Sequence, residues 1–555
     1  MQSVSLYDTH KYKISEATDA LFKRYFYAAY PENPKTYAED ADAKGKTAFA
    51  TQMNQDFKEL QQGESALYIG EEVSPYLQVG IGVKYPSFTV DSLISNAQRA
   101  FVQWRDLEVN TRAGILVETL ERLKARFFDI AYATMHTTGQ SFMMSFQASG
   151  PHACDRALEA IVQGIAELKR YPEQAEWKKN LGKFDLVLHK SWKPISKGVG
   201  LVIGCSTFPT WNSVPGLYAS LITGNSVIVK PHPKAILPIA IVVAEIQKVL
   251  VENGIDPCVC QLAVDTVSEP ITKLLAEHTA IKLIDYTGST GFGKYIESLP
   301  NKSVFTENAG VNSVILHSTH DLKATMQNIA FSLSLYSGQM CTAPQNIFIP
   351  KTGVETPTGV VDYETCANAL TEAIQAIVNN PKAGPPTLGA IQSDITLKRT
   401  QSAMNLGGKV LLASTSIKND EFENARMATP SIIEVQSSDL NIYKSEQFGP
   451  IAFVVKCKNI EECIAIASTM AIDDGAITCL AFCTDAEVKQ KILVAMNNAF
   501  TPVSFNFKGA AFVNAHAAFS DFHVTGGNPS GNASFSNADY VNRRFVWVGN
   551  REMRD

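Results

Sequence analysis

The sequence predicts an α/β protein with two doubly wound domains. Three observations support this prediction. Short apolar runs typical of buried strands alternate with amphipathic helical stretches, and this alternation occurs twice along the chain. At roughly 150 residues per domain, a length of 555 residues corresponds to about two to four domains. A content of 45% hydrophobic and 19% charged residues is typical of a globular protein with a sizeable core.

The first alternation extends to about residue 306. It follows two regions with helical spacing of apolar residues, between Val90 and Met135 and between Cys154 and Tyr171. Because continuous apolar runs are typical of strands covered on both faces, we expect a parallel sheet here. The expected strands are Phe184–Trp192, Gly198–Gly204, Ser226–Lys230, Val259–Val264 and Ile281–Asp285, with helices over Pro238–Asn253 and Glu269–His278.

The second alternation predicts another α/β unit. Its expected strands are Ser313–Leu316, Asn346–Ile349, Lys409–Leu412, Ile432–Val435, Ile451–Val455 and Ile477–Phe482. Helices are expected near Leu322–Leu335, Tyr363–Asn379 and Ile460–Ala471. A last strand is expected at Arg544–Val548, and helical stretches at the other end from Ala17 to Tyr30 and from Ala38 to Leu60.

Charge and composition exclude several classes of protein. The formal charge of −6 gives no basic footprint for nucleic acid. No window approaches about 18 uninterrupted apolar residues, so we expect no membrane span. The first residues lack the apolar core of a signal peptide, and ten cysteines in this length do not form a disulfide scaffold. We therefore expect a cytoplasmic protein with neither nucleic acid nor membrane as a partner.

Cysteine and histidine spacing predicts no metal site, because no Cys-x-x-Cys pair occurs and the histidines are scattered. Most cysteines lie in apolar runs, where a small buried side chain is the usual role. Cys341 differs, since Ser-Gly-Gln-Met precedes it and Thr-Ala-Pro follows it. It is the candidate nucleophile.

Two more segments complete a candidate site. Gly288-Ser-Thr-Gly-Phe-Gly293 follows an expected strand and opens a helix, where backbone N–H groups can bind phosphate. Glu307-Asn-Ala-Gly310 comes next, and Ser337-Gly-Gln-Met-Cys341 is third. Each has an ordinary explanation when taken alone, as a tight turn, a solvated surface charge or an inert buried thiol.

Together the segments resemble the aldehyde dehydrogenase superfamily over roughly residues 75–550. The resemblance includes Gly224-Asn-Ser-Val-Ile-Val-Lys-Pro231 and Glu446-Gln-Phe-Gly-Pro450, in the family's order. Within the superfamily, Phe208-Pro-Thr-Trp211, the Lys-Pro-His-Pro run and the long N-terminus are most similar to the phenylacetic acid degradation (PaaN-type) group.

The resemblance implies a role for each residue. Cys341 would be the nucleophile and Glu307 the general base that activates water. Thr207, with the Cys341 backbone N–H, would hold the oxyanion. The remaining implied residues would contact the nicotinamide cofactor: Lys230, Lys234, Gly288, Ser289, Glu446 and Phe448.

The resemblance also implies a domain plan. Residues 1–70 would form an N-terminal helical extension, and residues 71–182 and 193–306 the dinucleotide-binding domain. Residues 307–527 would form the catalytic domain. Residues 183–192 and 528–555 would form a small β element for oligomerisation, and we expect a homodimer or homotetramer.

Two positions depart from the family pattern. Thr207 occupies the place where most members have the Asn whose amide holds the oxyanion. Pro233 stands where NAD-preferring members commonly carry a Glu, and Lys234 follows it. Because cations select a 2′-phosphate and carboxylates reject it, NADP is expected over NAD.

The expected function is oxidation of an aldehyde or semialdehyde to the acid, with NADP or NAD. The PaaN-type resemblance suggests that the substrate is a semialdehyde of aromatic catabolism, either free or linked to CoA as a thioester. Two alternatives stay open at this point. One is a CoA-acylating aldehyde dehydrogenase, in which CoA replaces water. The other is a catalytically weak homologue that binds a ligand or serves in assembly.

Overall fold

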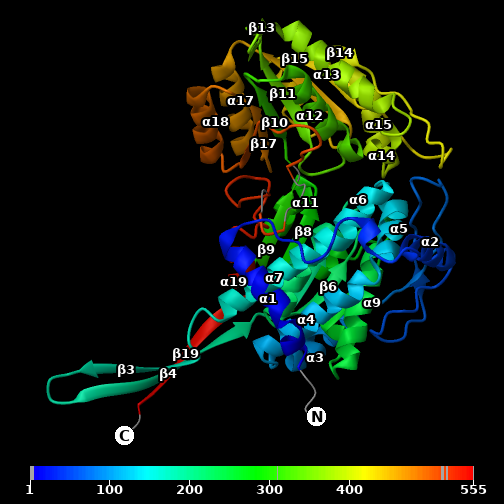
Figure 1. Cartoon of the computed structure of the whole chain (residues 1–555). Coiled ribbons are helices and arrows are strands. Elements are labelled where there is room, and N and C mark those ends of the chain that lie inside the picture. The colour runs from blue at the N-terminus through cyan, green and yellow to red at the C-terminus, as the bar shows by residue number, and fades with distance from the viewer. Residues whose placement is uncertain (1–4, 309, 514–517, 521–522, 554–555) are drawn as a thin grey trace.

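The computed structural model describes residues 5–308, 310–513, 518–520 and 523–553. Two α/β units lie one above the other, and a thin β arm projects from the lower one (Figure 1). This confirms the expected fold class. None of the described helices is long and apolar enough to cross a membrane.

The lower unit is built on a five-stranded parallel sheet with the strand order β7-β6-β5-β8-β9. Successive side chains of a strand point to opposite faces, and both faces are buried here. Leu201 packs in the cluster that includes α10 and α11, whereas its neighbour Val202 packs in the cluster that includes α8 and α9. The elements are β5 (Val199–Ile203), β6 (Ser226–Lys230), β7 (Cys260–Leu262), β8 (Ile281–Gly288), β9 (Ser303–Asn308), α3 (Val90–Arg105), α8 (Pro209–Ile222), α9 (Leu237–Glu252), α10 (Thr272–Glu277) and α11 (Thr290–Glu297).

The upper unit holds a seven-stranded sheet with the order β14-β15-β16-β11-β10-β17-β18, parallel except for the edge strand β14. Its strands are β10 (Asn312–Leu316), β11 (Pro344–Pro350), β14 (Lys409–Leu412), β15 (Ser431–Gln436), β16 (Ile451–Cys457), β17 (Cys479–Phe482) and β18 (Val503–Phe505). The helices are α12 (Leu322–Ser334), α13 (Tyr363–Val378), α14 (Gly384–Leu388), α15 (Asp394–Ser402), α16 (Leu440–Tyr443), α17 (Ile460–Asp473) and α18 (Ala486–Asn498), and β12 (Val354–Thr356) pairs with β13 (Gly359–Val361).

The N-terminal helices differ from the expected ones. The first begins at Leu6 because the Ser5 side chain caps it by accepting from the N–H of Asp8, and it ends where Arg24 adopts a φ of 54°. This part packs onto the lower unit through buried Ala17 and Ala20. The elements are α1 (Leu6–Lys23), α2 (Ala41–Gln52), β1 (Tyr68–Ile69), β2 (Tyr85–Pro86), α4 (Val109–Lys124), α5 (Phe127–Thr138), α6 (Phe142–Gln147) and α7 (Ala153–Leu168).

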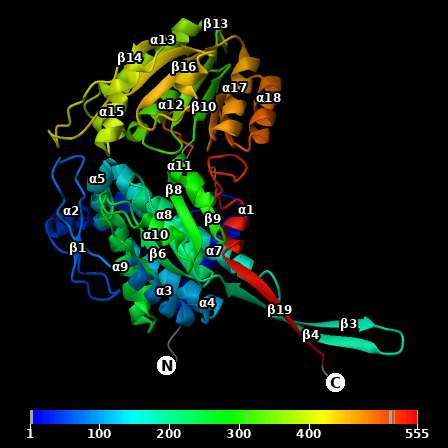
Figure 2. The ribbon, with the colours of Figure 1, turned by 180° about the vertical axis from the view of Figure 1, so that it is seen from behind.

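The β arm has different bounds from the expected oligomerisation element. It is an antiparallel sheet of β3 (Gln174–Asn180), β4 (Asp185–Ser196) and β19 (Phe545–Met553), with β4 in the middle (Figure 2). Strand β3 was missed because its residues are polar and mostly exposed, so it gives no apolar run. Residues 528–544 do not join the arm: the loop before α19 (Asp539–Asn542) bonds to β9, and Tyr540 of α19 packs against Phe305 of β9.

Candidate active site

Cys341 follows a strained loop that joins α12 to β11. Tyr336, Ser337 and Gly338 have φ values of 48°, 51° and 60°, a region that costs about 1–3 kcal/mol for a residue other than glycine. A side chain at Gly338 would lie 2.6 Å from the carbonyl oxygen of Gly449, so only glycine fits there. The loop therefore needs firm anchors to hold this conformation.

Buried hydrogen bonds supply these anchors. The Tyr336 hydroxyl donates to a backbone carbonyl of α5 at 2.6 Å, and the Ser337 hydroxyl donates to one of α14 at 2.9 Å. The Gln339 amide donates to the carbonyl of Ala390 at 3.0 Å. These bonds fix the direction in which the loop presents Cys341.

Glu307 lies on β9, whose carboxyl end faces the upper unit. A C-terminal loop pairs with this strand: Gly531 forms an antiparallel bridge with Glu307, and the N–H of Asn308 donates to Ser530 at 2.7 Å. The Glu307 carboxylate accepts from the side-chain amide of Asn212 at 2.9 Å. The structure thus places the predicted base on a strand held from both sides.

His523 is the residue that sequence reasoning missed. Its Nε2 lies 3.6 Å from Cys341 Sγ and 3.4 Å from Glu307 Oε1. The donor atoms of these three residues all lie within 4.8 Å of one another, and the side chain of His523 is fully buried. His523 is one of ten histidines scattered along the sequence, and no motif or regular spacing marks it as a functional residue. Only the fold brings it to the thiol.

Cys341 itself sits in a setting that opposes ionisation. Burial raises the pKa of the Cys341 thiol well above its usual range, and the neighbouring Glu307 carboxylate raises it further. The thiolate is the nucleophilic form of cysteine. The site therefore needs a group that takes the thiol proton and offsets the charge of Glu307.

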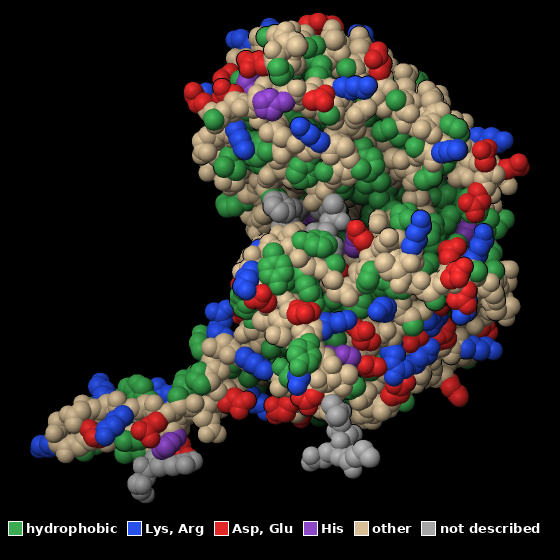
Figure 3. All heavy atoms as spheres, viewed as in Figure 1, with side chains coloured by type: hydrophobic (Ala, Val, Ile, Leu, Met, Phe, Trp, Pro, Cys, Tyr) green, Lys and Arg blue, Asp and Glu red, His purple; other side chains and the backbone are tan. Residues whose placement is uncertain are grey.

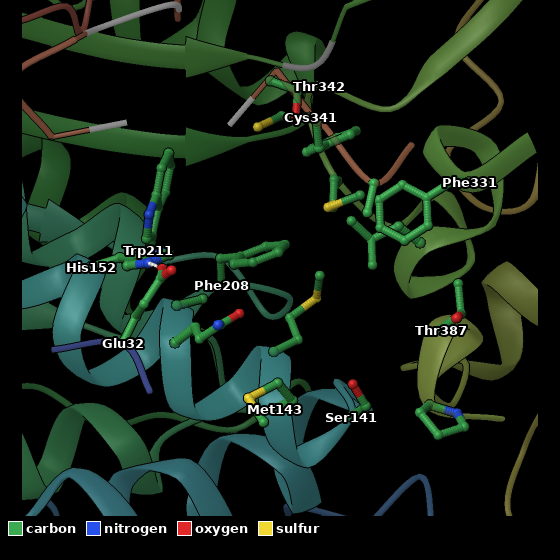
Figure 4. A pocket seen from close by; sticks show the side chains of 18 of the residues that line it. Glu32, Ser141, Met143, His152, Phe208, Trp211, Phe331, Cys341, Thr342 and Thr387 are labelled. Atoms are coloured by element: carbon green, nitrogen blue, oxygen red, sulfur yellow. Dashed lines mark hydrogen bonds and ion pairs between the residues drawn. The ribbon is translucent and has the colours of Figure 1, made fainter. Parts of the chain in front are cut away.

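A cavity of about 510 Å³ leads to Cys341. Phe208 and Phe331 face it from opposite sides, and Glu32 and His152 pair at 2.7 Å beside Trp211 (Figure 4). Among the described lining residues there is no lysine or arginine. The surface between the two units is hollowed, and hydrophobic side chains gather there (Figure 3).

Thr207 lies close to the site, but its hydroxyl faces Cys205 Sγ at 3.9 Å, and its carbonyl accepts from Gln140. Asn212 lines the cavity together with Cys341, whereas Thr207 is not among the described lining residues. In this arrangement the side-chain amide beside the nucleophile comes from Asn212.

Lys230 ends β6, at the carboxyl edge of the lower sheet. Its ammonium is buried and pairs with Asp265, 2.6 Å away, a partner that the sequence analysis did not anticipate. Burial lowers the pKa of Lys230, and Asp265 opposes that change. Lys230 is therefore held as one half of a buried ion pair.

The other predicted residues of the lower unit lie at the same edge. Gly288 ends β8, and Ser289 precedes α11 without using its hydroxyl as a cap, so the start of this helix can accept a phosphate. The N–H of Lys234 donates to the His232 ring. Burial, aided by two neighbouring lysines, lowers the pKa of His232 to about 4, so His232 adds no positive charge near neutral pH.

Glu446 and Phe448 lie in the loop before β16, and Gly449 of this loop contacts Gly338 of the Cys341 loop. Withdrawal from water raises the pKa of the Glu446 carboxyl to about 7, partly opposed by Arg399. Arg399 also donates to the carbonyl of Phe448 at 2.7 Å. The approach of Gly449 to Gly338 thus joins the Glu446 loop to the Cys341 loop, and Arg399 joins it to α15.

Comparison with known proteins agrees with this geometry. The model of the aldehyde dehydrogenase family matches residues 83–508. A crystal structure of an NAD-dependent aldehyde dehydrogenase from Burkholderia multivorans superposes with a TM-score of 0.96 and 41% identity over 99% of both chains. The chain belongs to the aldehyde dehydrogenase family. The expected superfamily and enzyme class are therefore confirmed.

More distant aldehyde dehydrogenases share less of the sequence. An alpha-ketoglutaric semialdehyde dehydrogenase of Bacillus subtilis is 25% identical over 68% of this chain and 74% of its own length. The matches span from 53% to 80% of the curated relatives' lengths. A 1-pyrroline-5-carboxylate dehydrogenase from Thermus with bound NAD is 18% identical, with a TM-score of 0.74 over 96% of this chain and 99% of its own, and shares the fold.

Proposed function

We propose that this aldehyde dehydrogenase oxidises an uncharged, largely apolar aldehyde to its carboxylic acid with NAD(P)⁺, using Cys341 as the nucleophile. The observation that carries the proposal is that Cys341 lines a largely apolar cavity and lies beside the buried Glu307 carboxylate. A thiol next to a base, at a cavity that fits a small molecule, is the arrangement that covalent catalysis requires.

The chemistry of each side chain follows from its position. The Cys341 thiolate adds to the aldehyde carbon and forms a thiohemiacetal. The cofactor, when bound, supplies the hydride acceptor, and loss of hydride leaves a thioester on Cys341. Glu307 then takes a proton from the attacking water, and the acid leaves with Cys341 free. Asn212 keeps the Glu307 carboxylate in place through its 2.9 Å bond.

The geometry favours Asn212 over Thr207 as the side chain beside the reacting carbonyl, because the Thr207 hydroxyl faces Cys205. Replacement of an oxyanion donor typically lowers kcat by about 10²–10³-fold. A Thr207→Val variant that retains its full rate would exclude the hydroxyl as that donor. A loss of this size would instead assign the role to Thr207.

The residues present fit a dinucleotide. Ser289 and the start of α11 would hold a phosphate, and Lys230 would hold the adenosine ribose. Glu446 and Phe448 would contact the nicotinamide end, since their loop packs against the Cys341 loop. Lys234 favours NADP, whereas the Asp265 carboxylate beside Lys230 favours NAD.

The lining of the cavity supports the substrate class. Its described side chains include Phe208, Trp211, Phe331 and Phe512, which suit an aromatic or alkyl group. No described lysine or arginine is present to bind a carboxylate or a phosphate. The aromatic lining is compatible with the PaaN-type resemblance. The half-exposed carboxylate of Glu32 in the cavity lining disfavours a CoA thioester, because CoA carries several negative charges.

Substrate charge provides a direct test of this assignment. We expect phenylacetaldehyde to exceed succinic semialdehyde in kcat/KM by about tenfold or more, a difference of about 1.4 kcal/mol. Replacement of the carboxylate in a Glu32→Gln variant should narrow that ratio by improving the anionic aldehyde alone. Equal use of both aldehydes by the unmodified enzyme would contradict the proposed substrate class.

The reaction itself is tested by rapid mixing. The enzyme should form NAD(P)H in a first turnover with an apolar aldehyde, and Cys341→Ser should form none. A Cys366→Ala variant, which changes a buried cysteine of α13, serves as the control and should behave like the unmodified protein. If no aldehyde gives NAD(P)H with the unmodified protein, the ligand-binding alternative gains support.

Water and CoA can be distinguished as acyl acceptors. Glu307→Gln should still form one equivalent of NAD(P)H per Cys341 but lose most of the later turnovers, because the thioester then lacks its water-activating base. If added CoA restores turnover in the variant and accelerates the unmodified enzyme, the CoA-acylating alternative is correct.

The β arm supports self-association. Both of its outer strands present open edges, and Ile195, Val546 and Val548 are exposed. We propose that a second copy of the chain covers this arm in a homodimer or homotetramer. Light scattering should show an oligomer for the full chain and a smaller species once residues 177–188 are replaced by a Gly-Asn turn that joins the paired residues Glu176 and His189.

A further inference from the structure

We propose that His523 is a catalytic residue: its Nε2 takes the proton of the Cys341 thiol, and Glu307 stabilises the imidazolium that forms. This inference rests on the proposed function, since it assigns the step that prepares Cys341 for attack. It gives the C-terminal loop a chemical role in addition to its packing against β9.

The geometry places one nitrogen between two partners. His523 Nε2 is 3.6 Å from the Cys341 sulfur, within reach of a hydrogen bond to sulfur, and 3.4 Å from the Glu307 carboxylate. The Glu307 side chain is only 4% exposed and that of His523 is not exposed at all. Water therefore competes little for these groups, and their mutual charges act at short range.

The ring is also held in position. Trp211 packs edge-on against it, with the ring centres 5.4 Å apart. The same Trp211 ring contacts the buried guanidinium of Arg156, whose central carbon lies 4.0 Å from the ring centre. An imidazole that is fixed in this way can meet the sulfur without a rotamer search, which proton transfer requires.

Glu307 is a poorer acceptor for the thiol proton than His523. A carboxylate ordinarily titrates near pH 4 and an imidazole near pH 6.5. Proton transfer from a thiol is therefore less unfavourable to the imidazole than to the carboxylate, by about two pKa units. A thiolate formed beside the Glu307 carboxylate would also be repelled by it, and this repulsion is part of why the pKa of Cys341 is raised. An imidazolium between the two anions removes that repulsion.

The proton balance is simple. The proposed step starts from neutral His523 with its proton on Nδ1, and Nε2 accepts the S–H proton of Cys341. The products are the Cys341 thiolate and an imidazolium whose Nε2–H points at the thiolate and at Glu307. No electron is transferred in this step. When the thioester is later hydrolysed, the thiolate leaves and regains this proton from His523.

The groups that face His523 set the pH dependence. They are Glu307, which favours the imidazolium, and Cys341, which does so once it is ionised. Cys205 also lies near Cys341 and raises its pKa. Arg156 contacts the same Trp211 ring as His523, and its charge opposes a positive charge on the His523 ring. Glu307, 3.4 Å from Nε2, is the charged group that stabilises the imidazolium once the proton has been transferred.

Alkylation of Cys341 by iodoacetamide tests the proposal, because only the thiolate reacts. The rate constant at Cys341, followed by mass spectrometry of its peptide, is measured from pH 5 to pH 10 in the full chain and in His523→Gln. We expect the midpoint to rise by about one pH unit or more in the variant, so that alkylation at pH 7 falls about tenfold or more. The rate should recover at high pH.

A structural role for His523 would give a different result. It would lower the rate by a similar factor at every pH and leave the midpoint in place. His523→Asn provides a second neutral variant if His523→Gln folds poorly. The matched control is His10→Gln, which removes a buried histidine–carboxylate pair with Glu118 in the N-terminal part, and it should leave the midpoint unchanged.

The outcomes separate the two proposals. An unchanged midpoint in both His523 variants would overturn the role of His523, and the proposed function would stand if Cys341→Ser still lacks the first turnover. A shifted midpoint in a protein that oxidises no aldehyde would support the His523–Cys341 pair and refute the proposed function. With both proposals correct, the first turnover at pH 7 should slow by about 10²-fold in His523→Gln.

Discussion

The side-chain amide of Asn312 donates to the backbone carbonyl of Cys341 at 2.7 Å. The same amide donates to the carbonyl of Ala343 at 3.0 Å, and its oxygen accepts from the N–H groups of Ile477 and Thr478. A single buried residue at the start of β10 thus connects the nucleophile loop to the strand β17 region. The position of the Cys341 sulfur therefore depends on Asn312.

Replacement of Asn312 should therefore affect both folding and catalysis. In Asn312→Leu, two carbonyls and two N–H groups lose their buried partner, at about 1–3 kcal/mol for each group that stays unpaired. We expect a loss of about 3 kcal/mol or more in unfolding free energy. We also expect kcat to fall by about tenfold or more, because a displaced nucleophile misses the attack geometry. Urea unfolding and single-turnover kinetics measure these effects.

Asn225→Leu is the matched control for this experiment. Asn225 is also fully buried, and its amide donates to the carbonyl of Arg544 and to the hydroxyl of Thr223, away from the cavity. It should destabilise the fold while leaving kcat per folded molecule unchanged. Equal losses of kcat in the two variants would show that reduced stability alone, and not the Asn312–Cys341 bond, explains the effect.

The contrast between Cys341 and His523 shows what could be predicted from the sequence. The two α/β units were predictable because apolar runs such as Ser226–Lys230 report burial locally. Cys341 and Glu307 were predictable because each lies in a motif. His523, Asn312 and Asp265 were not, since their roles come from contacts between segments that lie far apart in the sequence. Strand β3 was missed because an exposed polar strand leaves no periodic signal.

The carboxyl of Glu446 predicts a pH dependence of cofactor binding. Its pKa is raised to about 7, so it is protonated below that pH and ionised above it. If the carboxylate accepts from ribose hydroxyls, cofactor affinity should rise by about tenfold between pH 6 and pH 8. Quenching of tryptophan fluorescence by added NAD⁺ or NADP⁺ measures this. Glu446→Gln should bind the cofactor more weakly at pH 8, and its cofactor affinity should no longer change with pH. If the pH dependence is retained in this variant, another group is responsible for it.

The buried pair of Lys230 and Asp265 predicts how cofactor preference can be changed. Asp265→Asn removes the negative charge 2.6 Å from the Lys230 ammonium. A 2′-phosphate can then serve as the counter-ion, so kcat/KM for NADP relative to NAD should rise by up to about tenfold at pH 7. Lys234→Ala is the companion variant and should lower the use of NADP alone. An unchanged ratio in Asp265→Asn would show that the ribose lies away from this pair.

A second buried ion pair joins the arm to the lower unit. Arg544, one residue before β19, donates to both carboxylate oxygens of Asp285 on β8, at 2.6 and 2.7 Å, and lies over the ring of Phe305. Breaking such a pair leaves one charge buried without its partner. We therefore expect Arg544→Met to lower the unfolding free energy by about 3–5 kcal/mol.

The double variant Asp285→Leu with Arg544→Met isolates the cause of this loss. Removal of both charges should recover most of the lost stability, since buried ion pairs often contribute little beyond their own desolvation cost. Lys178→Met, which breaks the exposed pair of Lys178 with Asp185 on the arm, is the control and should leave the melting temperature unchanged. If the double variant is as unstable as Arg544→Met, the guanidinium stabilises the fold through its contact with Phe305 and its other hydrogen bonds, and the uncompensated Asp285 charge is not the reason for the loss.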